Sequence, residues 1–454
     1  MVKVYPFLLF SISALGCAAT TGRMSYDTGY DDYSRLAGQP ERQPDARATG
    51  SGIAGGEVLD RAEYVRAVLQ SNPSIESARQ SWRAALAHVR QAGSFDDPTV
   101  DLGIAPLSIG SHAPVGYEVA VSQHLPWFGK RSLDAAATAG EAEAAKSDYE
   151  TTKRELALVA VTLYDQYFVA ERAIEINQRH VELMRVMRAS ATAQLETGRG
   201  SLQDPLQAEV ELAHMEHDSA VLSSQRDVTV AQMNELMHRA PELPLPPPAK
   251  ELALPPALDA SAIPYLERVA VGQRSEIAAA RHRAEAAQAR ADRADRDAYP
   301  DLTLSTSYDS MWDMPQHRWM VGVGFNVPIQ SGRRSGSADE SRAVRARFEA
   351  DARRMTDAAR TQVFVAFKKL EAATHSVTVF ETRLLPAALN QIDAARAGFT
   401  TSQNPFMAVV EAEKNLRTVE LDYETARAEC DQQRAELDRA LGRIPGLETN
   451  GVEK

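Results

Sequence analysis

The sequence predicts an internally duplicated fold of mixed α and β type, in which long helical hairpins are joined to four short strands. Three observations indicate this fold. Four stretches of the first half recur in order in the second half, very long segments lack Gly and Pro, and each half holds two segments in which apolar and polar residues alternate. Alternation with period two is typical of strands, whereas apolar spacing of three and four is typical of helices.

The N-terminus predicts export. Residues 1–17, MVKVYPFLLFSISALGC, combine one Lys, an apolar run and small residues ending at Cys17, which is the pattern of a secretion signal peptide. ALGC is similar to a bacterial lipobox, although Ala14 stands where Leu is usual, so we expect lipidation of Cys17. The alternative is an ordinary signal peptide cut near Ala18 or Ala19. Residues 18–56, rich in Gly, Ser, Asp and Tyr, are expected to form an extended tether.

The internal repeat defines the domain organisation. LPWFGKRS (125–132) aligns with VPIQSGRRS (327–335), and GRGSLQDPLQAEVE (198–211) aligns with GFTTSQNPFMAVVE (398–411). Two further pairs, around Pro98 and Pro300 and at the two repeat ends, keep nearly the same offset of 200 to 204 residues. We therefore expect a first repeat over 57–240, a proline-rich connector over 241–258, a second repeat over 259–445 and a tail over 446–454.

Each repeat is expected to contain a very long helix, a sharp turn and a second long helix. No Gly or Pro occurs over 141–197 or 337–385, which predicts helices of about 50 to 65 residues, with coiled-coil-like apolar spacing. Gly198 and Gly398 are expected to end the first helix of each pair. The second helices are expected to begin with Asp204 and Asn404 as N-caps, followed by Pro205 and Pro405.

The strands have two unlike faces. Apolar or aromatic residues alternate with small or polar ones over 100–104, 117–122, 302–312 and 319–329. This is the pattern of a transmembrane β-barrel, with lipid outside and water inside. The alternative is two ordinary hairpins covered by helices. Four strands cannot close a barrel, so several chains must share one: two copies give eight strands, and three copies give the twelve that leave room for an aqueous lumen.

Composition excludes several classes of function. A net charge of −12 and a pI near 5.4, with Arg interleaved among acidic residues, argue against nucleic-acid binding. Two cysteines, Cys17 and Cys430, give no disulfide framework, and Cys430 is expected to be buried. No nucleophile and base pair, phosphate loop or closed metal-ligand set is present at meaningful spacing, so we predict no enzyme activity and no cofactor.

One loop has residues that suit a soft metal ion. MWDMPQHRWM (311–320) contains Met311, Met314, His317 and Met320, and thioether and imidazole ligands suit Cu(I) and similar ions. The alternative is an ordinary apolar loop surface.

The motifs QHLPWFGKR, NVPIQSGRR, TGRGSLQDPLQAEVELA and YPDLTLSTSY, together with the duplication, resemble the TolC-like family of outer-membrane efflux proteins over essentially all of the mature sequence. The resemblance implies a homotrimer with a shared 12-stranded transmembrane β-barrel and a periplasmic α-barrel. It also implies a periplasmic adaptor (membrane fusion) protein and an inner-membrane transporter as partners. Hairpin tips that contact the adaptor would be Thr197, Gly198, Arg199, Gly200, Ser201, Gly398, Phe399, Thr400, Thr401 and Ser402. Acidic rings close the inner end in the family; Asp204 matches such a position, with a plain N-cap as the alternative, and Asn404 stands at the equivalent place.

The expected function is therefore an exit duct of a tripartite efflux system in the outer membrane, lipid-anchored and with a large periplasmic portion. Heavy-metal cations are the cargo implied by the resemblance of QHLPWFGKR to family members that serve heavy-metal efflux pumps. The alternatives are a duct for drugs or for type I secretion and, from another class, a lipoprotein coiled-coil scaffold without a pore.

Overall fold

The computed structural model describes residues 19–36, 57–105, 116–252, 259–312, 314–401 and 403–447. These residues form two compact units. The first contains the strands and is made from Met1–Glu41, Ala78–Tyr149 and Glu276–Met355. The second contains the helical hairpins and is made from Arg42–Ser77, Glu150–Ser275 and Thr356–Lys454.

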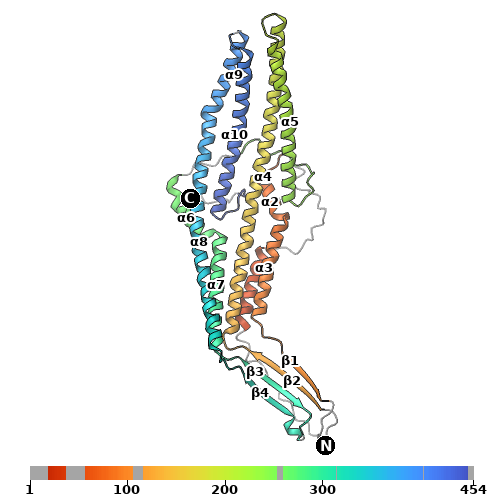
Figure 1. Cartoon of the computed structure of the whole chain (residues 1–454), viewed down its shortest axis with the longest axis vertical. Coiled ribbons are helices and arrows are strands. Elements are labelled where there is room, and N and C mark those ends of the chain that lie inside the picture. The colour runs from red at the N-terminus through yellow and green to blue at the C-terminus, as the bar shows by residue number, and fades with distance from the viewer. Residues whose placement is uncertain are drawn as a thin grey trace. The chain divides into compact units, whose positions relative to one another are not determined.

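The first unit has a four-stranded antiparallel sheet attached to helices (Figure 1). The strands are β1 (Thr99–Ala105), β2 (Gly116–Leu125), β3 (Leu302–Asp309) and β4 (Trp319–Phe325), and they lie in this order across the sheet. The helical elements of this unit are α1 (Ala19–Leu36), most of α3 (Pro73–Ala92), the first part of α4 (Lys130–Glu196), α7 (Ser275–Asp295), the 3-10 turns η2 (Arg296–Ala298) and η3 (Pro315–His317), and the first part of α8 (Ser331–Val379).

The register of the sheet places apolar residues opposite one another on all four strands. Leu102 pairs with Val119, Val119 pairs with Tyr308, and Tyr308 pairs with Trp319. Because directly opposed residues point to the same face of a sheet, the alternation in each strand adds up to one apolar face and one small or polar face.

The expected strand ends were wrong at two places. β3 ends at Asp309 and β4 ends at Phe325, so Trp312, Val327 and Ile329 follow the strands, although the alternation continues through them. Pro328 has no N–H to give to a strand partner, and the N–H of Ile329 turns back to the carbonyl of Val327.

The expected extended tether was also wrong over its described part, because residues Ala19–Leu36 form the helix α1. The ring of Tyr33 packs edge-on against Trp82 at 5.1 Å, and the buried Trp82 stacks on Tyr149 at 5.9 Å. Asp32 pairs with Lys146 at 2.7 Å. These contacts hold α1 against α3 and α4, which the composition of the segment does not predict. Residues 37–56 of the expected tether lie outside the described residues.

The second unit contains two helical hairpins. One consists of the second part of α4 and α5 (Gln203–Leu236); the other consists of the second part of α8, a π-helical turn η4 (Phe380–Leu384), α9 (Leu385–Thr400) and α10 (Phe406–Ala440). The unit also holds α2 (Arg61–Ser71), η1 (Ala260–Ala262) and α6 (Ile263–Gln273). Buried apolar side chains at helical spacing fill the hairpins, among them Phe168, Met184, Leu212, Phe367, Phe399, Phe406 and Val409.

The long helices are longer than expected. Helix α4 has 67 residues and passes through Gly140, where an added Cβ would lie 3.0 Å from the carbonyl oxygen of His282. The first helix of the second pair was expected to end at Gly398, and the chain stays helical to Thr400. Its helical course past Pro386 depends on η4, in which the N–H of Leu385 donates to the carbonyl of Phe380. This register shift places Pro386 in the first turn of α9, where a missing N–H is tolerated.

None of the helices in the described ranges combines the length and the apolar character needed to cross a membrane.

Candidate functional site

One face of the sheet exposes a continuous apolar surface, which we call the apolar sheet face. Leu102 is 73% exposed and Val321 is 85% exposed. A contiguous exposed apolar patch marks a surface that meets a membrane or a partner. Helices do not cover this face in the described residues, which argues against two ordinary covered hairpins. Its exposed members are Val100, Leu102, Ile104, Tyr117, Val119, Val121, Leu304, Trp319, Val321, Val323 and Phe325.

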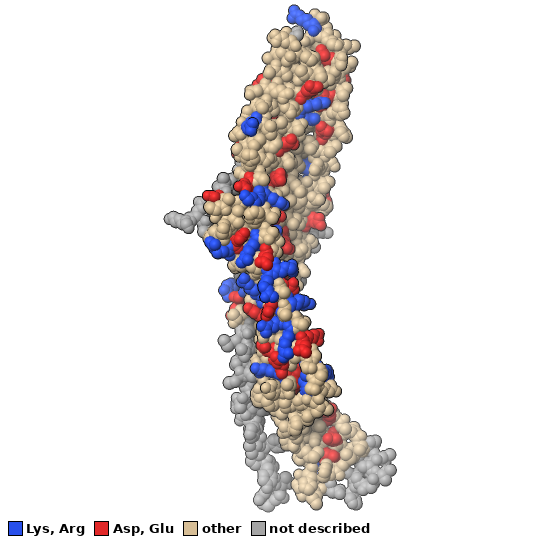
Figure 2. Space-filling view, turned by 60° about the vertical axis from the view of Figure 1, so that its left-hand side comes forward, with Lys and Arg blue, Asp and Glu red and all other residues tan. Residues whose placement is uncertain are grey.

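Aromatic rings cluster on this face where β2, β3 and β4 meet the loops. Tyr117 stacks on Tyr308 at 5.8 Å, and Tyr308 packs edge-on against Trp319 at 5.2 Å. Figure 2 shows that the strand region of the visible face is largely uncharged, whereas charged side chains of both signs are interspersed over the helices. An uncharged band with an aromatic border is typical of a surface at hydrocarbon depth.

The opposite face of the sheet carries small or polar side chains, such as Gly103, Ser122, Ser305 and Gly322. The two outer strands, β1 and β4, have no strand partner on their outer sides within the described residues. An open sheet edge in hydrocarbon leaves N–H and C=O groups unpaired at several kcal/mol each. The sheet is therefore incomplete as a single copy.

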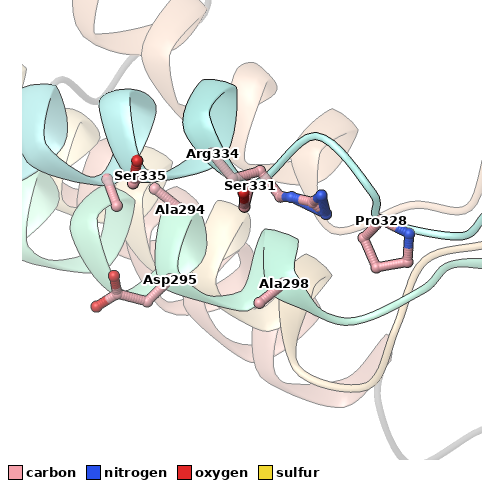
Figure 3. A pocket seen from close by; sticks show the side chains of 8 residues that line it. Ala294, Asp295, Ala298, Pro328, Ser331, Arg334 and Ser335 are labelled. Carbon is pink, nitrogen blue, oxygen red and sulfur yellow. The ribbon is translucent and has the colours of Figure 1, made fainter.

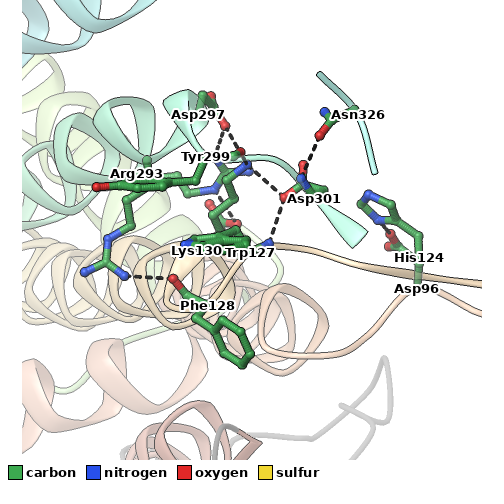
Figure 4. Close-up of polar contacts among 12 residues, drawn as sticks. Asp96, His124, Trp127, Phe128, Lys130, Arg293, Asp297, Tyr299, Asp301 and Asn326 are labelled. Carbon is green, nitrogen blue, oxygen red and sulfur yellow. Dashed lines mark hydrogen bonds and ion pairs between the residues drawn. The ribbon is translucent and has the colours of Figure 1, made fainter. Parts of the chain in front are cut away.

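The passage from strands to helices is held by a buried ammonium group (Figure 4). Lys130, at the start of α4, is only 2% exposed and donates to Asp301 Oδ1 at 2.8 Å and to the carbonyl of Tyr299 at 3.1 Å. Asp301 also accepts the N–H of Trp127 at 2.7 Å, and its own N–H donates to Asn326 Oδ1. This cluster ties the end of β2 to the start of β3 and the end of β4.

Electrostatics explain the stability of this cluster. Burial favours the neutral carboxyl of Asp301, but the hydrogen bonds from the Lys130 ammonium and the Trp127 N–H outweigh it and hold the pKa of Asp301 below its ordinary value of 3.8. The Trp127 ring stacks flat on Tyr299 at 5.7 Å and covers one side of the cluster. Lys130 lies in the motif FGKR and Asp301 in the motif YPDL, and no local pattern in either motif predicts that the two side chains meet.

The first hairpin tip confirms one expected glycine and corrects the expected cap. Helix α4 ends at Glu196, and Gly198 has φ of 72°, as a C-terminal glycine should. Asp204 is not the N-cap, because α5 begins at Gln203. Instead Ser201 Oγ accepts the N–H of Gln203, and the Asp204 carboxylate accepts the N–H of Ser201 at 3.2 Å. The two side chains form a reciprocal capping pair.

The second tip differs. Gly398 does not end a helix, because α9 runs on to Thr400. An added Cβ at Gly398 would lie 2.2 Å from Asn404 Nδ2, so the glycine is needed for close packing. Pro405 is the N-cap and α10 begins at Phe406, so Asn404 precedes the cap. Its N–H donates to the carbonyl of Gly398 at 3.1 Å.

The remaining tip residues lie as follows. Thr197, Arg199 and Gly200 follow α4, and Thr400 and Thr401 bond back to the carbonyl of Ala397. Phe399 is buried against Phe406. Ser402 and Cys17 lie outside the described residues.

The residues of the candidate metal loop make separate local contacts. Met311 lies against Gly116, Met314 Sδ is 3.5 Å from Gln316 Nε2, and His317 packs edge-on against Trp312 at 6.2 Å. Met320 lies in β4, on the face opposite to Trp319. Among the described residues, no three His, Cys, Asp or Glu side chains gather in a way that would hold a metal ion.

The other cysteine, Cys430, is buried, as expected. Burial raises the pKa of its thiol, which lies 3.6 Å from Thr374 Oγ1.

A pocket of about 320 Å³ lies where the second repeat passes from strands to helices (Figure 3). Small side chains of α7 and α8 line it, with Asp295 and Arg334 at its polar side. Asp295 is paired with Arg342 at 2.7 Å.

Ion pairs with one buried partner join the two hairpins, and no sequence pattern predicted them. Glu211 of α5 is 4% exposed and lies 2.6 Å from Lys414 of α10. Arg417 of α10 reaches Asn177 of α4 at 3.1 Å and Asp218 of α5 at 3.2 Å. Apolar spacing predicts which helices pair, but not which charges meet across them.

Solved channel structures share this fold. The chain is similar to CusC, with 16% identity, 88% of this chain and 96% of that chain covered, and a TM-score of 0.74. It is similar to the outer-membrane protein VceC from Vibrio cholerae, with 17% identity, coverage of 84% and 96%, and a TM-score of 0.71. It is also similar to the open state of the outer-membrane channel MtrE from Neisseria gonorrhoeae, with 17% identity, coverage of 84% and 89%, and a TM-score of 0.70. No curated protein sequence gives a significant match.

The fold is the one that these solved outer-membrane proteins share. The outer membrane efflux protein family matches residues 64–237 and 268–443, one stretch in each repeat and together more than half of the chain. The chain belongs to this family, which confirms the TolC-like resemblance. The family consists of channels and not of enzymes.

Proposed function

We propose that the chain is the outer-membrane exit duct of a tripartite efflux system, and that three copies share one 12-stranded β-barrel. The observation that carries this proposal is the four-stranded sheet with an exposed apolar face and two open edges. The apolar sheet face meets lipid, and the small and polar face lines the lumen. Three sheets of four strands bring the edges of β1 and β4 together and leave an aqueous passage.

A second unpartnered surface supports assembly from several copies. The outward face of α5 exposes Leu206, Val210, Val221 and Val228, each between 49% and 59% exposed. Their separations of four, eleven and seven residues keep them on one side of the helix, as in the contact stripe of a coiled coil. In the proposed trimer this stripe packs against a helix of the neighbouring copy and closes an α-barrel.

The two hairpin tips are the proposed contact with a periplasmic adaptor, which in turn joins an inner-membrane transporter. Residues Thr197–Ser201 and 398–402 form the tips, and Asp204 and Asn404 stand beside them as the proposed gate. Because Asp204 carries a carboxylate and Asn404 is uncharged, the gate of this chain carries one acidic ring rather than two.

The proposed cargo is heavy-metal cations, with Met311, Met314, His317 and Met320 as soft ligands near the exit, and Cys17 as the proposed lipid anchor. A drug or protein cargo is the alternative within the same duct.

The test is reconstitution of the full chain purified from outer membranes. We expect heat-sensitive trimers that conduct ions in planar bilayers, whereas a water-soluble, non-conducting monomer would point to a coiled-coil scaffold instead. A host that lacks its own ducts then receives the chain with its neighbouring pump and adaptor. Rescue of growth on copper, silver, cobalt or zinc supports the metal cargo, and rescue on drugs alone refutes it. Loss of metal rescue in a Met311→Leu, Met314→Leu variant, with drug rescue unchanged, would identify the loop as the metal contact.

A further inference from the structure

A buried histidine lies between two carboxylates where the two hairpins meet. His180 of α4 is 3% exposed; its Nδ1 is 2.5 Å from Glu413 Oε1 and its Nε2 is 3.1 Å from Glu420 Oε2, both on α10. Glu413 is fully buried, and Glu420 is 16% exposed. The two glutamates are seven residues apart, which is about two helical turns, so they lie on one face of α10 and enclose the imidazole from both sides.

With both glutamates ionised, this geometry requires a doubly protonated ring. A neutral imidazole has one N–H donor and one acceptor nitrogen, so it can satisfy only one of two ionised carboxylates and turns a lone pair toward the other. An imidazolium donates to both. Glu413 Oε2 has no hydrogen-bond partner, so the imidazole provides the hydrogen bond that its buried carboxylate receives.

Charged side chains of α4, α5 and α10 surround the histidine. Arg179 and Arg172 of α4 add positive charge beside Glu420. From α5, Glu211 and Asp218 face the α10 cations Lys414 and Arg417. Among these groups, His180 is the one whose ordinary pKa of 6.5 lies close to neutral pH.

The direction of the shift follows from these contacts. Burial alone lowers the pKa of His180, but the hydrogen bonds that the ring donates to the carboxylates of Glu413 and Glu420 outweigh it, so the pKa is raised above 6.5. A raised folded-state pKa means that the stabilisation is fully present below 6.5 and is lost as the pH rises through the folded-state pKa.

We propose that His180, Glu413 and Glu420 form a proton-dependent clamp between the two hairpins of the chain, closed while the imidazole is doubly protonated and released as the pH rises. Release removes the His180 contacts between α4 and α10, while Arg417 still bonds to Asn177 of α4 and Lys414 still pairs with Glu211 of α5, so the hairpins loosen without separating. For its conductance readout, this inference rests on the proposed duct.

The first readout does not need a conducting duct. Amide hydrogen exchange is measured on the full chain in detergent between pH 5.5 and 8.5, with exchange rates corrected for intrinsic pH dependence. In the wild type, protection of the α10 segment around 413–420 should fall as the pH rises, with a midpoint above 6.5. In H180Q this protection should not titrate. The control H214Q changes an exposed histidine of α5 and should titrate like the wild type.

A third variant separates the clamp from a merely structural contact. In E420Q the amide can donate to a neutral Nε2, so the second proton is no longer required, and the midpoint should fall by about one pH unit or more. An unchanged midpoint in E420Q, or an unchanged titration in H180Q, overturns the proposal.

Conductance in planar bilayers is the second readout. The wild type and H214Q should conduct more as the pH rises through the same midpoint, and H180Q should show no such rise. If the wild type does not conduct at any pH while exchange still titrates with His180, the duct fails and the clamp stands. If the wild type conducts and H180Q keeps its pH response, the clamp as a control of the duct fails and the duct stands.

Discussion

The two repeats of the chain have the same element order, but different side-chain contacts hold their strand-to-helix junctions and their hairpin tips. In the first repeat a buried Lys130 closes the passage from strands to helices, whereas the aligned Arg333 of the second repeat is exposed and a pocket lies beside it. The first hairpin turns on a left-handed glycine, whereas the second turns on a close contact between Gly398 and Asn404. The duplication thus conserves the architecture, and individual side chains decide how each copy is held.

The largest difference in the free energy of unfolding is expected from substitutions at the strand-to-helix junctions of the two repeats. Lys130→Met should lower the free energy of unfolding by about 3 to 5 kcal/mol, because it leaves the carboxylate of Asp301 without its buried cation. Arg333→Met, on an exposed side chain, should change it by no more than about 0.5 kcal/mol. Denaturant unfolding in detergent measures both, and equal losses in the two variants would show that the junctions are not different.

The same cluster should make the first junction sensitive to acid. Because the pKa of Asp301 is lowered from 3.8, its contribution to stability is present above pH 3.8 and is lost as the pH falls through the lowered value. Between pH 5 and 2 the free energy of unfolding of the wild type should therefore fall. In Lys130→Met this contribution is already absent, so the fall should be smaller. A variant with the same acid-dependent loss as the wild type would assign that loss to other carboxylates.

At the tips, substitution of the two glycines should destabilise the protein for different reasons. Gly398→Val should destabilise the protein by about 1 to 3 kcal/mol through overpacking against Asn404, and part of this loss should be recovered by adding Asn404→Ala. Gly198→Ala has open space around its Cβ, so it should lose only the backbone term of about 1 to 2 kcal/mol. A double-mutant cycle in thermal unfolding checks this, and the absence of coupling between 398 and 404 would contradict it.

The smallest effect is expected from the cap. Ser201→Ala removes the acceptor of the Gln203 N–H and should cost about 1 kcal/mol, with faster hydrogen exchange in the first turn of α5. Thr401→Ala in the second tip removes hydroxyl contacts to Ala397 and Gly398 but no cap, so it should cost only a few tenths of a kcal/mol. Equal effects at the two tips would mean that Ser201 does not cap.

Periodicity in the sequence predicts the helices and strands, but not the contacts that join them. The alternation over 319–329 and the Gly-free run over 141–197 predicted a two-faced strand and a very long helix, because each depends on a local repeating pattern, although the strand itself ends at Phe325. The second long helix was predicted to end at Gly398, but the π-turn that carries it past Pro386 was not predicted, because no local pattern marks such a change of hydrogen-bond register. The Lys130 and Asp301 pair and the His180 clamp join residues more than 150 positions apart, and no local pattern records them.

The central claim is that neighbouring copies share one barrel through β1 and β4. Its most direct test is disulfide cross-linking in native outer membranes, with single cysteines placed on both edges, at 100, 102 or 104 in β1 and at 321 or 323 in β4, in a Cys430→Ala background. We predict that at least one pair gives covalent dimers and trimers, with a ladder that stops at three chains. Cross-links confined to one chain, or a ladder that stops at two, would contradict the shared 12-stranded barrel.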